Sequence, residues 1–428
     1  MDTFIEFFSF RDSSIVSVVV GAILLTASSA VVGTFTFLRK KALVGDAVAH
    51  SVLPGICLAF ILSGTKNPLI LIIGAFITGW LSLVIIDAIT KRTKLKEDTA
   101  IALVLSVFFG IGILMLTNIQ HSGNAAQTGL DSFLFGKAAA LVGRDLIVFS
   151  IVAVILILTV TLFFKELKII AFDSNYAKAL GLPVKAIDLL LTTLTVLAVV
   201  TGIQAVGVVL MAAMLITPAA AARFWTNDVK KMTVIAAVMG SVSGLAGAYV
   251  SFVAPAMPTG PWIVMIISAI ALSSFFIAPK RGIFSRYFSQ RKLQVQIMDE
   301  NLLKALFHLG EKDEDMYKGR TVNEIIEKRY FPKNRLTSSL KRLKRQGYLQ
   351  RVEGDWVFTE VGRQKGQRVV KLHRLWELYL STYVKIASDH VHEDAETIEH
   401  IITPELEAEL ERMLEYPEMD PHKEPIPY

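Results

Sequence analysis

Nine apolar segments within the first 280 residues constrain the fold of this chain more than any other feature of its sequence. Each segment is long enough, or nearly so, to cross a hydrocarbon core about 30 Å thick as a helix. The whole chain is 53% hydrophobic, more than an ordinary soluble protein contains. The sequence therefore predicts an all-α polytopic membrane domain with about eight or nine transmembrane helices. We expect these helices at about 15–38, 43–63, 68–90, 98–117, 145–164, 187–203, 204–222, 232–254 and 260–279, with a turn at 201–204 between the sixth and the seventh.

Positive charge is divided unevenly between the two ends of these segments. The connections that share one face carry 15 Lys and Arg residues, and those on the other face carry four. By the positive-inside rule, the first face is cytoplasmic. We therefore expect a multi-pass membrane protein, with its N-terminus outside and everything after Lys280 in the cytosol. The first apolar segment is too long and too weakly basic at its start for a cleaved signal peptide, so we interpret it as a retained span.

Asp46 and His50 lie four residues apart at the head of the second apolar segment. On a helix this spacing places both side chains on one face. An ionisable residue inside a membrane marks a functional site by default, and an oxygen donor beside a nitrogen donor suits Mn²⁺, Zn²⁺ or Fe²⁺. The alternatives are a hydrogen bond that locks two helices together and a helix cap at the membrane edge. Asp46 follows Lys41 closely, and Pro54-Gly55 can break the helix, so the sequence leaves the depth of the pair open.

Three stretches resemble the manganese/zinc/iron-type ABC transporter permeases, namely 39–55, 172–182 and 207–220. The resemblance covers roughly residues 10–280, and we assign 1–280 to a transmembrane permease domain. It implies an importer subunit in the bacterial inner membrane for a divalent metal, with manganese first and zinc or iron as alternatives. Its partners would be a second permease chain, identical or paralogous, an ATPase dimer and an extracellular metal-binding protein. Asp46 and His50 would lie on the metal path.

The stretch 172–182 is short, Ala-rich and of mixed polarity, and it falls on the positively charged face. By the family resemblance it docks onto the ATPase, and the alternative is a helix that lies on the lipid headgroups. No Gly-x-x-x-x-Gly-Lys-Ser/Thr motif occurs in the chain. We therefore expect a transport subunit that does not itself hydrolyse ATP. The predicted docking residues are Phe172, Asp173, Ala177, Ala179, Leu180 and Gly181.

The polar remainder of the chain predicts a winged helix-turn-helix followed by a helical metal-binding and dimerisation region. Helical spacing over 299–310, a capping box at Thr321–Glu324 and a basic helix over 333–346 precede an alternating stretch at 348–359. That stretch reads as a two-stranded wing. We assign a basic linker to 281–294, the winged helix to 295–360, the helical region to 361–415 and a tail to 416–428.

Nine Lys and Arg residues and no acidic residue lie between Lys328 and Arg351. Such a stripe is typical of phosphate contacts in DNA-binding proteins. The alternatives are an ordinary solvated helix face and attraction to an anionic inner leaflet. The candidate DNA contacts are Lys333, Arg335, Lys341, Arg342, Lys344 and Arg345.

Imidazoles and carboxylates recur at helical spacing beyond the wing, and such donors bind Mn²⁺, Fe²⁺ or Zn²⁺. An exposed acidic helix with incidental histidines is the alternative. The region 295–415 resembles the diphtheria toxin repressor and manganese transport regulator family. By that resemblance Asn301 and Lys304 stand where the family takes further donors, and a protonated lysine has no lone pair to donate. The predicted metal ligands are His373, Glu377, His392, Glu396, Glu399 and His400.

Together these features predict a metal-importing permease with a cytosolic domain that senses the same metal. A membrane-tethered or released metal-dependent DNA-binding repressor is the first alternative. A tail that serves only for dimerisation is the second.

Overall fold

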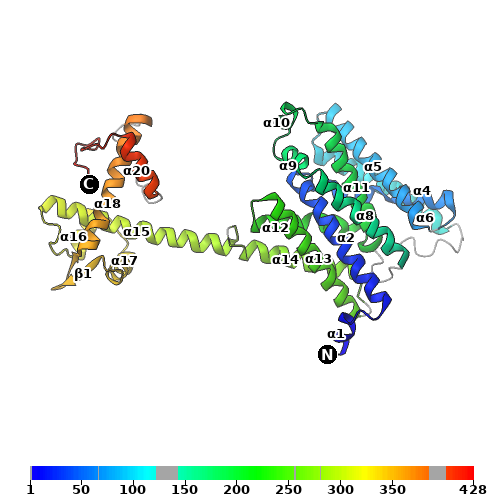
Figure 1. The fold of residues 1–428 in the computed structure, drawn as a ribbon, viewed down its shortest axis with the longest axis horizontal. Coiled ribbons are helices and arrows are strands. Elements are labelled where there is room, and N and C mark those ends of the chain that lie inside the picture. The colour runs from blue at the N-terminus through cyan, green and yellow to red at the C-terminus, as the bar shows by residue number, and fades with distance from the viewer. Residues whose placement is uncertain (1, 66, 122–142, 255–256, 280, 385–401) are drawn as a thin grey trace. The chain divides into compact units, whose positions relative to one another are not determined.

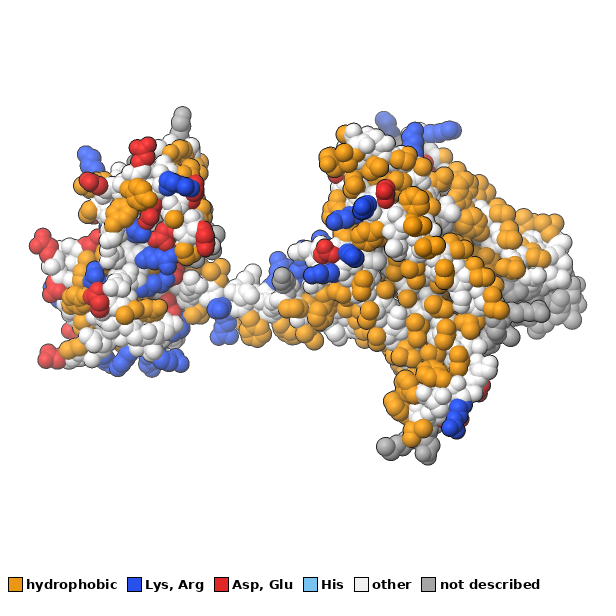
Figure 2. Space-filling model, viewed as in Figure 1, with side chains coloured by type: hydrophobic (Ala, Val, Ile, Leu, Met, Phe, Trp, Pro, Cys, Tyr) orange, Lys and Arg blue, Asp and Glu red, His pale blue; other side chains and the backbone are white. Residues whose placement is uncertain are grey.

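The computed structural model describes residues 2–65, 67–121, 143–254, 257–279, 281–384 and 402–428 (Figure 1). The chain forms two compact units, Met1–Ser285 and Arg286–Tyr428. Hydrophobic side chains cover much of the visible face of the first unit, whereas charged side chains are scattered over the second (Figure 2).

Helices are the only regular secondary structure in the described residues of the first unit. Within them, eight helical stretches are long and apolar enough to cross a membrane, and Leu210–Trp225 is a shorter apolar helix. The predicted polytopic architecture of about eight or nine spans is therefore confirmed. Its helices are α1 (Asp2–Phe8), α2 (Ser13–Leu38), α3 (Val44–Ser51), α4 (Leu53–Ser63), α5 (Pro68–Arg92), α6 (Glu97–His121), α8 (Gly143–Leu162), α9 (Phe164–Phe172), α10 (Ser174–Ala179), α11 (Val184–Val206), α12 (Val208–Trp225), α13 (Val229–Val253) and α14 (Thr259–Ile277).

The break between the sixth and seventh spans lies at Gly207, and the turn predicted at 201–204 is wrong. Residues 201–204 are helical and belong to α11, which continues to Val206. Gly207 alone separates α11 from α12, with a φ of 91° that favours glycine. Both helices are apolar up to this residue, so hydropathy could not locate the break.

The second span is interrupted in its middle. Helix α3 ends at Ser51 and α4 begins at Leu53, with Val52 as the joint. Pro54 lies in the first turn of α4, and because proline has no N–H, it cannot donate to the carbonyl of His50 as a helical residue would. Helix α3 packs against α5, α6, α11 and α12, which places it at the centre of the membrane domain.

The second unit has the predicted order of three helices, a wing and further helices. Leu302, Leu306, Leu336 and Trp356 contribute to its hydrophobic core. The Thr321–Glu324 capping box is present, and β1 pairs with β2 in an antiparallel register that aligns Leu349 with Phe358. The elements are α15 (Ile283–Asp313), α16 (Val322–Lys328), α17 (Lys333–Arg345), β1 (Leu349–Val352), β2 (Asp355–Phe358), α18 (Glu360–Tyr379), η3 (Leu380–Val384) and α20 (Pro404–Met413).

Helix α15 begins well before the helix expected at 299–310. Its first residue is Ile283, so most of the stretch assigned to a linker, 281–294, is helical. The predicted domain boundaries themselves stay predictions.

Candidate functional site

Asp46 lies in the first turn of α3 and His50 in its last turn, and both side chains are half-buried. The Nε2 atom of His50 is 3.5 Å from Oδ1 of Asp46. Two donors bound to one tetrahedral ion, each at about 2.1 Å, lie about 3.4 Å apart. The observed separation fits a pair of donors that share one metal ion, and it fits a direct contact between the two side chains equally well.

Two donors do not complete a coordination shell. No group of three His, Cys, Asp or Glu side chains gathers closely enough to hold an ion within the part of the chain that the structure describes. Among the described residues, Asp46 and His50 therefore have no third side chain of this kind beside them.

An aromatic side chain that sequence reasoning missed holds His50. The ring of Phe109 on α6 meets the imidazole edge to face, with centroids 5.1 Å apart and an interplanar angle of 85°. The Nδ1 atom of His50 is buried and has no hydrogen-bond partner among the described residues. Packing against Phe109 and the contact of Nε2 with Asp46 therefore both act on the orientation of this ring.

Arg39 links the end of α2 to the predicted docking region. Its Nη2 atom is 2.7 Å from Oδ1 of Asp188 on α11, and its Nη1 atom donates to the carbonyl of Ile170 on α9 at 2.8 Å. Helix α9 is thereby attached to both α2 and α11. Asp173 then caps the next helix, α10, by accepting from the backbone N–H groups of Asn175 and Tyr176.

The six predicted docking residues have different environments. Ala177 is fully buried, so it packs the docking segment against the protein interior. Phe172, Ala179 and Leu180 are exposed and are available to a partner. Gly181 has a φ of +76° and nothing near the position of a Cβ atom, so this glycine is required by the backbone and not by space. Asp173 caps the N-terminus of α10, as described above.

His373 and Glu377 come together on α18 as predicted. Their Nε2 and Oε1 atoms are 3.0 Å apart, and both side chains are buried. His392, Glu396, Glu399 and His400 lie outside the described residues. The pair lines a cleft of about 900 Å³ together with Lys304 and residues of the C-terminal tail.

A neutral and a basic residue, Asn301 and Lys304, occupy the two positions of the first helix, α15, where further donors were considered. Lys304 on α15 is buried, and the Nη1 atom of Arg329 donates to Oδ1 of Asn301 at 3.3 Å. Neither Asn301 nor Lys304 adds a carboxylate to the His373–Glu377 pair. The pair supplies one imidazole and one carboxylate, donors that suit a divalent metal.

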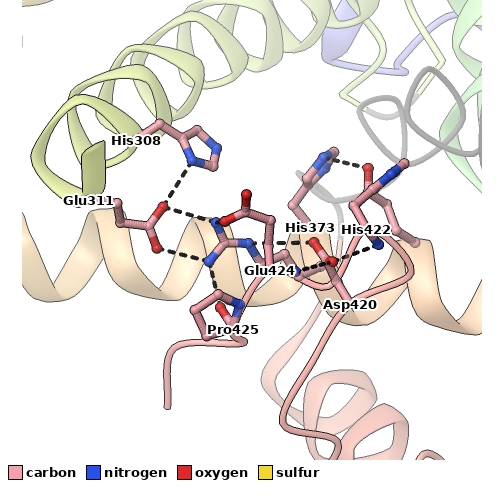
Figure 3. Close-up of polar contacts among 9 residues, drawn as sticks. His308, Glu311, His373, Asp420, His422, Glu424 and Pro425 are labelled. Atoms are coloured by element: carbon pink, nitrogen blue, oxygen red, sulfur yellow. Dashed lines mark hydrogen bonds and ion pairs between the residues drawn. The ribbon is translucent and has the colours of Figure 1, made fainter.

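Arg374 binds residues of the tail 416–428, a contact that sequence reasoning did not anticipate. Figure 3 shows the tail residues Asp420, Glu424 and Pro425 close to Glu311. The guanidinium of Arg374 is 3% exposed, binds both carboxylate oxygens of Glu311 at 2.9 Å and donates to the carbonyl of Pro425 at 2.6 Å. Asp420 and Glu424 lie 3.7 and 3.6 Å from it.

Glu311 also meets His308, whose Nδ1 atom is 3.0 Å from its Oε2 atom. Burial alone raises the pKa of Glu311, but the hydrogen bonds from His308 and Arg374 outweigh burial and lower it. Glu311 is therefore an anion at neutral pH, which favours the contact with Arg374. The tail is thus an ordered part of the wall of the cleft.

Helix α17 presents most of the predicted DNA contacts to solvent. Arg342 differs from the rest because it is half-buried and binds Asp299 of α15 through two hydrogen bonds of 2.5 Å. The five that are exposed are Lys333, Arg335, Lys341, Lys344 and Arg345.

Comparison with known proteins identifies both parts of the chain. Residues 11–278 match the ABC 3 transport family, and residues 359–428 match the metal binding and dimerisation domain of iron dependent repressors. The second match includes the tail of 416–428. Both resemblances noted in the sequence are therefore confirmed.

Individual relatives agree with this assignment. The manganese transport system membrane protein MntC of Bacillus subtilis is 42% identical over 372 residues, which are 87% of this chain and 85% of that protein. The zinc transport system membrane protein TroC of Treponema pallidum is 42% identical over 67% of this chain and 96% of its own length. Among solved structures, PsaBC of Streptococcus pneumoniae in complex with Fab has a TM-score of 0.60 at 34% identity, covering 67% of this chain and 99% of that one.

Proposed function

Because the chain belongs to the ABC 3 transport family, we propose that it is the permease subunit of an importer that carries manganese past Asp46 and His50. The observation that carries this proposal is the pair of donors, 3.5 Å apart on a helix at the centre of the membrane domain. Manganese is favoured because MntC, named for manganese transport, matches 87% of the chain. TroC is named for zinc transport, so zinc is the alternative cargo.

Metal uptake by a strain that lacks this protein, complemented with the chain, tests the assignment. Initial uptake rates are compared for Mn²⁺, Zn²⁺ and Fe²⁺ at equal concentrations. We expect complementation to restore Mn²⁺ uptake most strongly. Restoration of Zn²⁺ uptake alone would show that the cargo is zinc.

The energy for transport would come from a separate ATPase dimer that docks at residues 172–181. The exposed apolar side chains of Phe172 and Leu180 support this contact, and the Arg39 link to Asp188 would transmit movement of the segment to α2 and α11. A second permease chain, identical or paralogous, would complete the path. An extracellular metal-binding protein would deliver the ion, and the C-terminal unit would lie in the cytosol.

The C-terminal unit would report the cytosolic metal level to the transporter. The buried His373–Glu377 pair and the match to a metal-binding repressor domain support this role. Lys304 in the same cleft would weaken binding, so the domain would respond only when metal is abundant, as a feedback brake requires. Binding shifts such a domain by its differential affinity for two states, typically about 1–3 kcal/mol.

Deletion of residues 290–428 tests the brake. We expect the truncated protein to import metal normally but to keep importing in metal-replete cells, where the full chain slows. The double change Glu399→Ala with His400→Ala should act like the deletion. Equal uptake by truncated and full-length proteins at every internal metal level would exclude feedback.

DNA binding is the second candidate function, because α17 exposes five basic side chains on a winged-helix fold. Full-length protein in detergent is mixed with fragments of its own promoter region, with and without Mn²⁺. A metal-dependent mobility shift that Lys341→Ala with Lys344→Ala abolishes would support a repressor. No shift under either condition would leave transport regulation as the role of this unit.

A further inference from the structure

The first turns of α15 combine positive charge with the absence of any acidic residue. Between Arg281 and Met298 the sequence contains no Asp or Glu. Arg286, Arg291 and Lys292 are all exposed. A positive, acid-free stretch of this kind complements a negatively charged surface.

The same turns expose an aromatic face. Phe284, Tyr287 and Phe288 have the i, i+3, i+4 spacing that places side chains on one side of a helix, and they are 52%, 56% and 63% exposed. Val295 extends this face by two further turns. A helix with bulky apolar side chains on one face and basic residues beside them is typical of helices that lie in a membrane interface.

The position of this helix in the chain identifies the surface. Helix α14 crosses the apolar domain and ends at Ile277, and α15 begins six residues later at Ile283. The rings of Phe276 and Phe284 lie 5.8 Å apart, and Ser285 donates a hydrogen bond to the carbonyl of Pro279. The aromatic face therefore starts at the depth where a membrane-spanning helix ends, on the side that carries the excess of Lys and Arg.

We propose that residues 283–296 form an interfacial helix that binds the anionic headgroups of the cytoplasmic leaflet. Phe284, Tyr287 and Phe288 enter the boundary between headgroups and acyl chains. Arg291 and Lys292, on and beside that face, contact lipid phosphates by extending along the helix to the headgroup level. This contact holds the start of the C-terminal unit against the lipid, and it does not depend on which metal is transported.

Site-directed spin labelling of the full-length protein tests the proposal. Cys57 is the only cysteine in the chain, so Cys57→Ser gives a background in which one label can be placed at will. Phe288→Cys places the label on the aromatic face. Leu293→Cys places it on the opposite side of the helix and is the matched control. Each protein is reconstituted without the ATPase in phosphatidylcholine alone and in phosphatidylcholine with phosphatidylglycerol.

In the anionic membranes we expect the label at position 288 to be accessible to oxygen and shielded from a water-soluble nickel chelate. The label at position 293 should instead be accessible to the nickel chelate and less accessible to oxygen. Neutralising Arg291 and Lys292 to Gln should weaken the membrane-bound state by roughly fivefold for each charge removed. Equal access of the nickel chelate to both labels in both membranes would overturn the proposal. Spin–spin broadening at 288 that is independent of lipid charge would also overturn it, because the face would then bind a second copy of the chain.

Discussion

The Nε2 atom of His50 and the Oδ1 atom of Asp46 lie 3.5 Å apart on one face of α3. The helix that carries them is buried among α5, α6, α11 and α12 and ends at the Val52 joint, where Pro54 leaves the carbonyl of His50 without its usual helical donor. An imidazole, a carboxylate and a carbonyl are therefore concentrated within two turns of one interrupted helix. Interrupted helices of this kind form the ion sites of many transporters.

Phe109 should influence the affinity for metal through the orientation of His50. Replacing it with Ala removes an edge-to-face contact worth about 1 kcal/mol, so we expect the KM for Mn²⁺ uptake to rise roughly fivefold while membrane abundance is unchanged. Phe108→Ala is the matched control, since the neighbouring ring packs against the same hydrophobic core, whereas Phe109 makes the ring contact with the imidazole. Equal rises in KM for the two variants would show that the aromatic contact has no specific role.

Leu180 should contribute to binding of the ATPase. Leu180→Glu places a charge on an exposed apolar position beside α10, and we expect less ATPase to co-purify with the permease and uptake to fall in proportion. Leu95→Glu is the control, because Leu95 is another exposed leucine in a connection on the same side of the spans. If both variants retain the ATPase, the segment at 172–181 contacts lipid instead.

Features that depend on neighbouring residues could be predicted from the sequence. The spans follow from long apolar runs, the capping box from Thr321 and Glu324, and the Asp46–His50 pair from helical spacing. The break at Gly207 was misplaced because apolar residues continue on both sides of it, and only its positive φ marks the turn.

Contacts between distant segments left no pattern in the sequence. Phe109 reaches His50 from a different helix, and Arg374 binds tail residues about fifty positions later in the chain. No periodicity relates such residues, because tertiary packing alone brings them together. The basic stripe of α17 likewise concealed the difference between Arg342, which binds Asp299, and its exposed neighbours.

Arg342 should stabilise the winged helix, whereas Lys341 should not. Arg342→Ala removes two charge-assisted hydrogen bonds and leaves the largely buried Asp299 without this partner, so we expect a loss of about 2 kcal/mol in the free energy of unfolding. Lys341→Ala, at an exposed position of the same helix, should change the free energy of unfolding little. The comparison uses protection of α17 amides from hydrogen exchange in the full-length protein. Similar protection in both variants would contradict a structural role for Arg342.

Acid should loosen α20 from α18 through Glu407. Burial raises the pKa of this carboxyl, but hydrogen bonds from Lys371 and Arg368 prevail and hold it below its ordinary value of 4.5. The stabilisation is therefore complete above pH 4.5 and is lost as the pH falls through the lower folded-state pKa.

Hydrogen-exchange protection of the α20 amides, measured as a function of pH, checks this sign. We expect protection to decrease below pH 4.5, and Glu407→Gln to remove most of that pH dependence together with about 1 kcal/mol of protection at neutral pH. Glu409→Gln, on the more exposed part of the same helix, should keep the wild-type profile. If protection of the α20 amides increased as the pH fell, Glu407 would not be stabilised as an anion.

The charge of Asp46 provides the most direct test of the metal path. Asp46→Asn keeps the shape of the side chain but removes the charge that offsets the dehydration of a divalent cation. The measurement is the initial rate of Mn²⁺ uptake per unit of permease in the membrane, with Asp87→Asn as a control that removes an exposed carboxylate of the same domain. We predict that Asp46→Asn abolishes uptake at normal membrane abundance while Asp87→Asn retains it. Wild-type uptake by Asp46→Asn would contradict the assignment of this pair to the path of the ion.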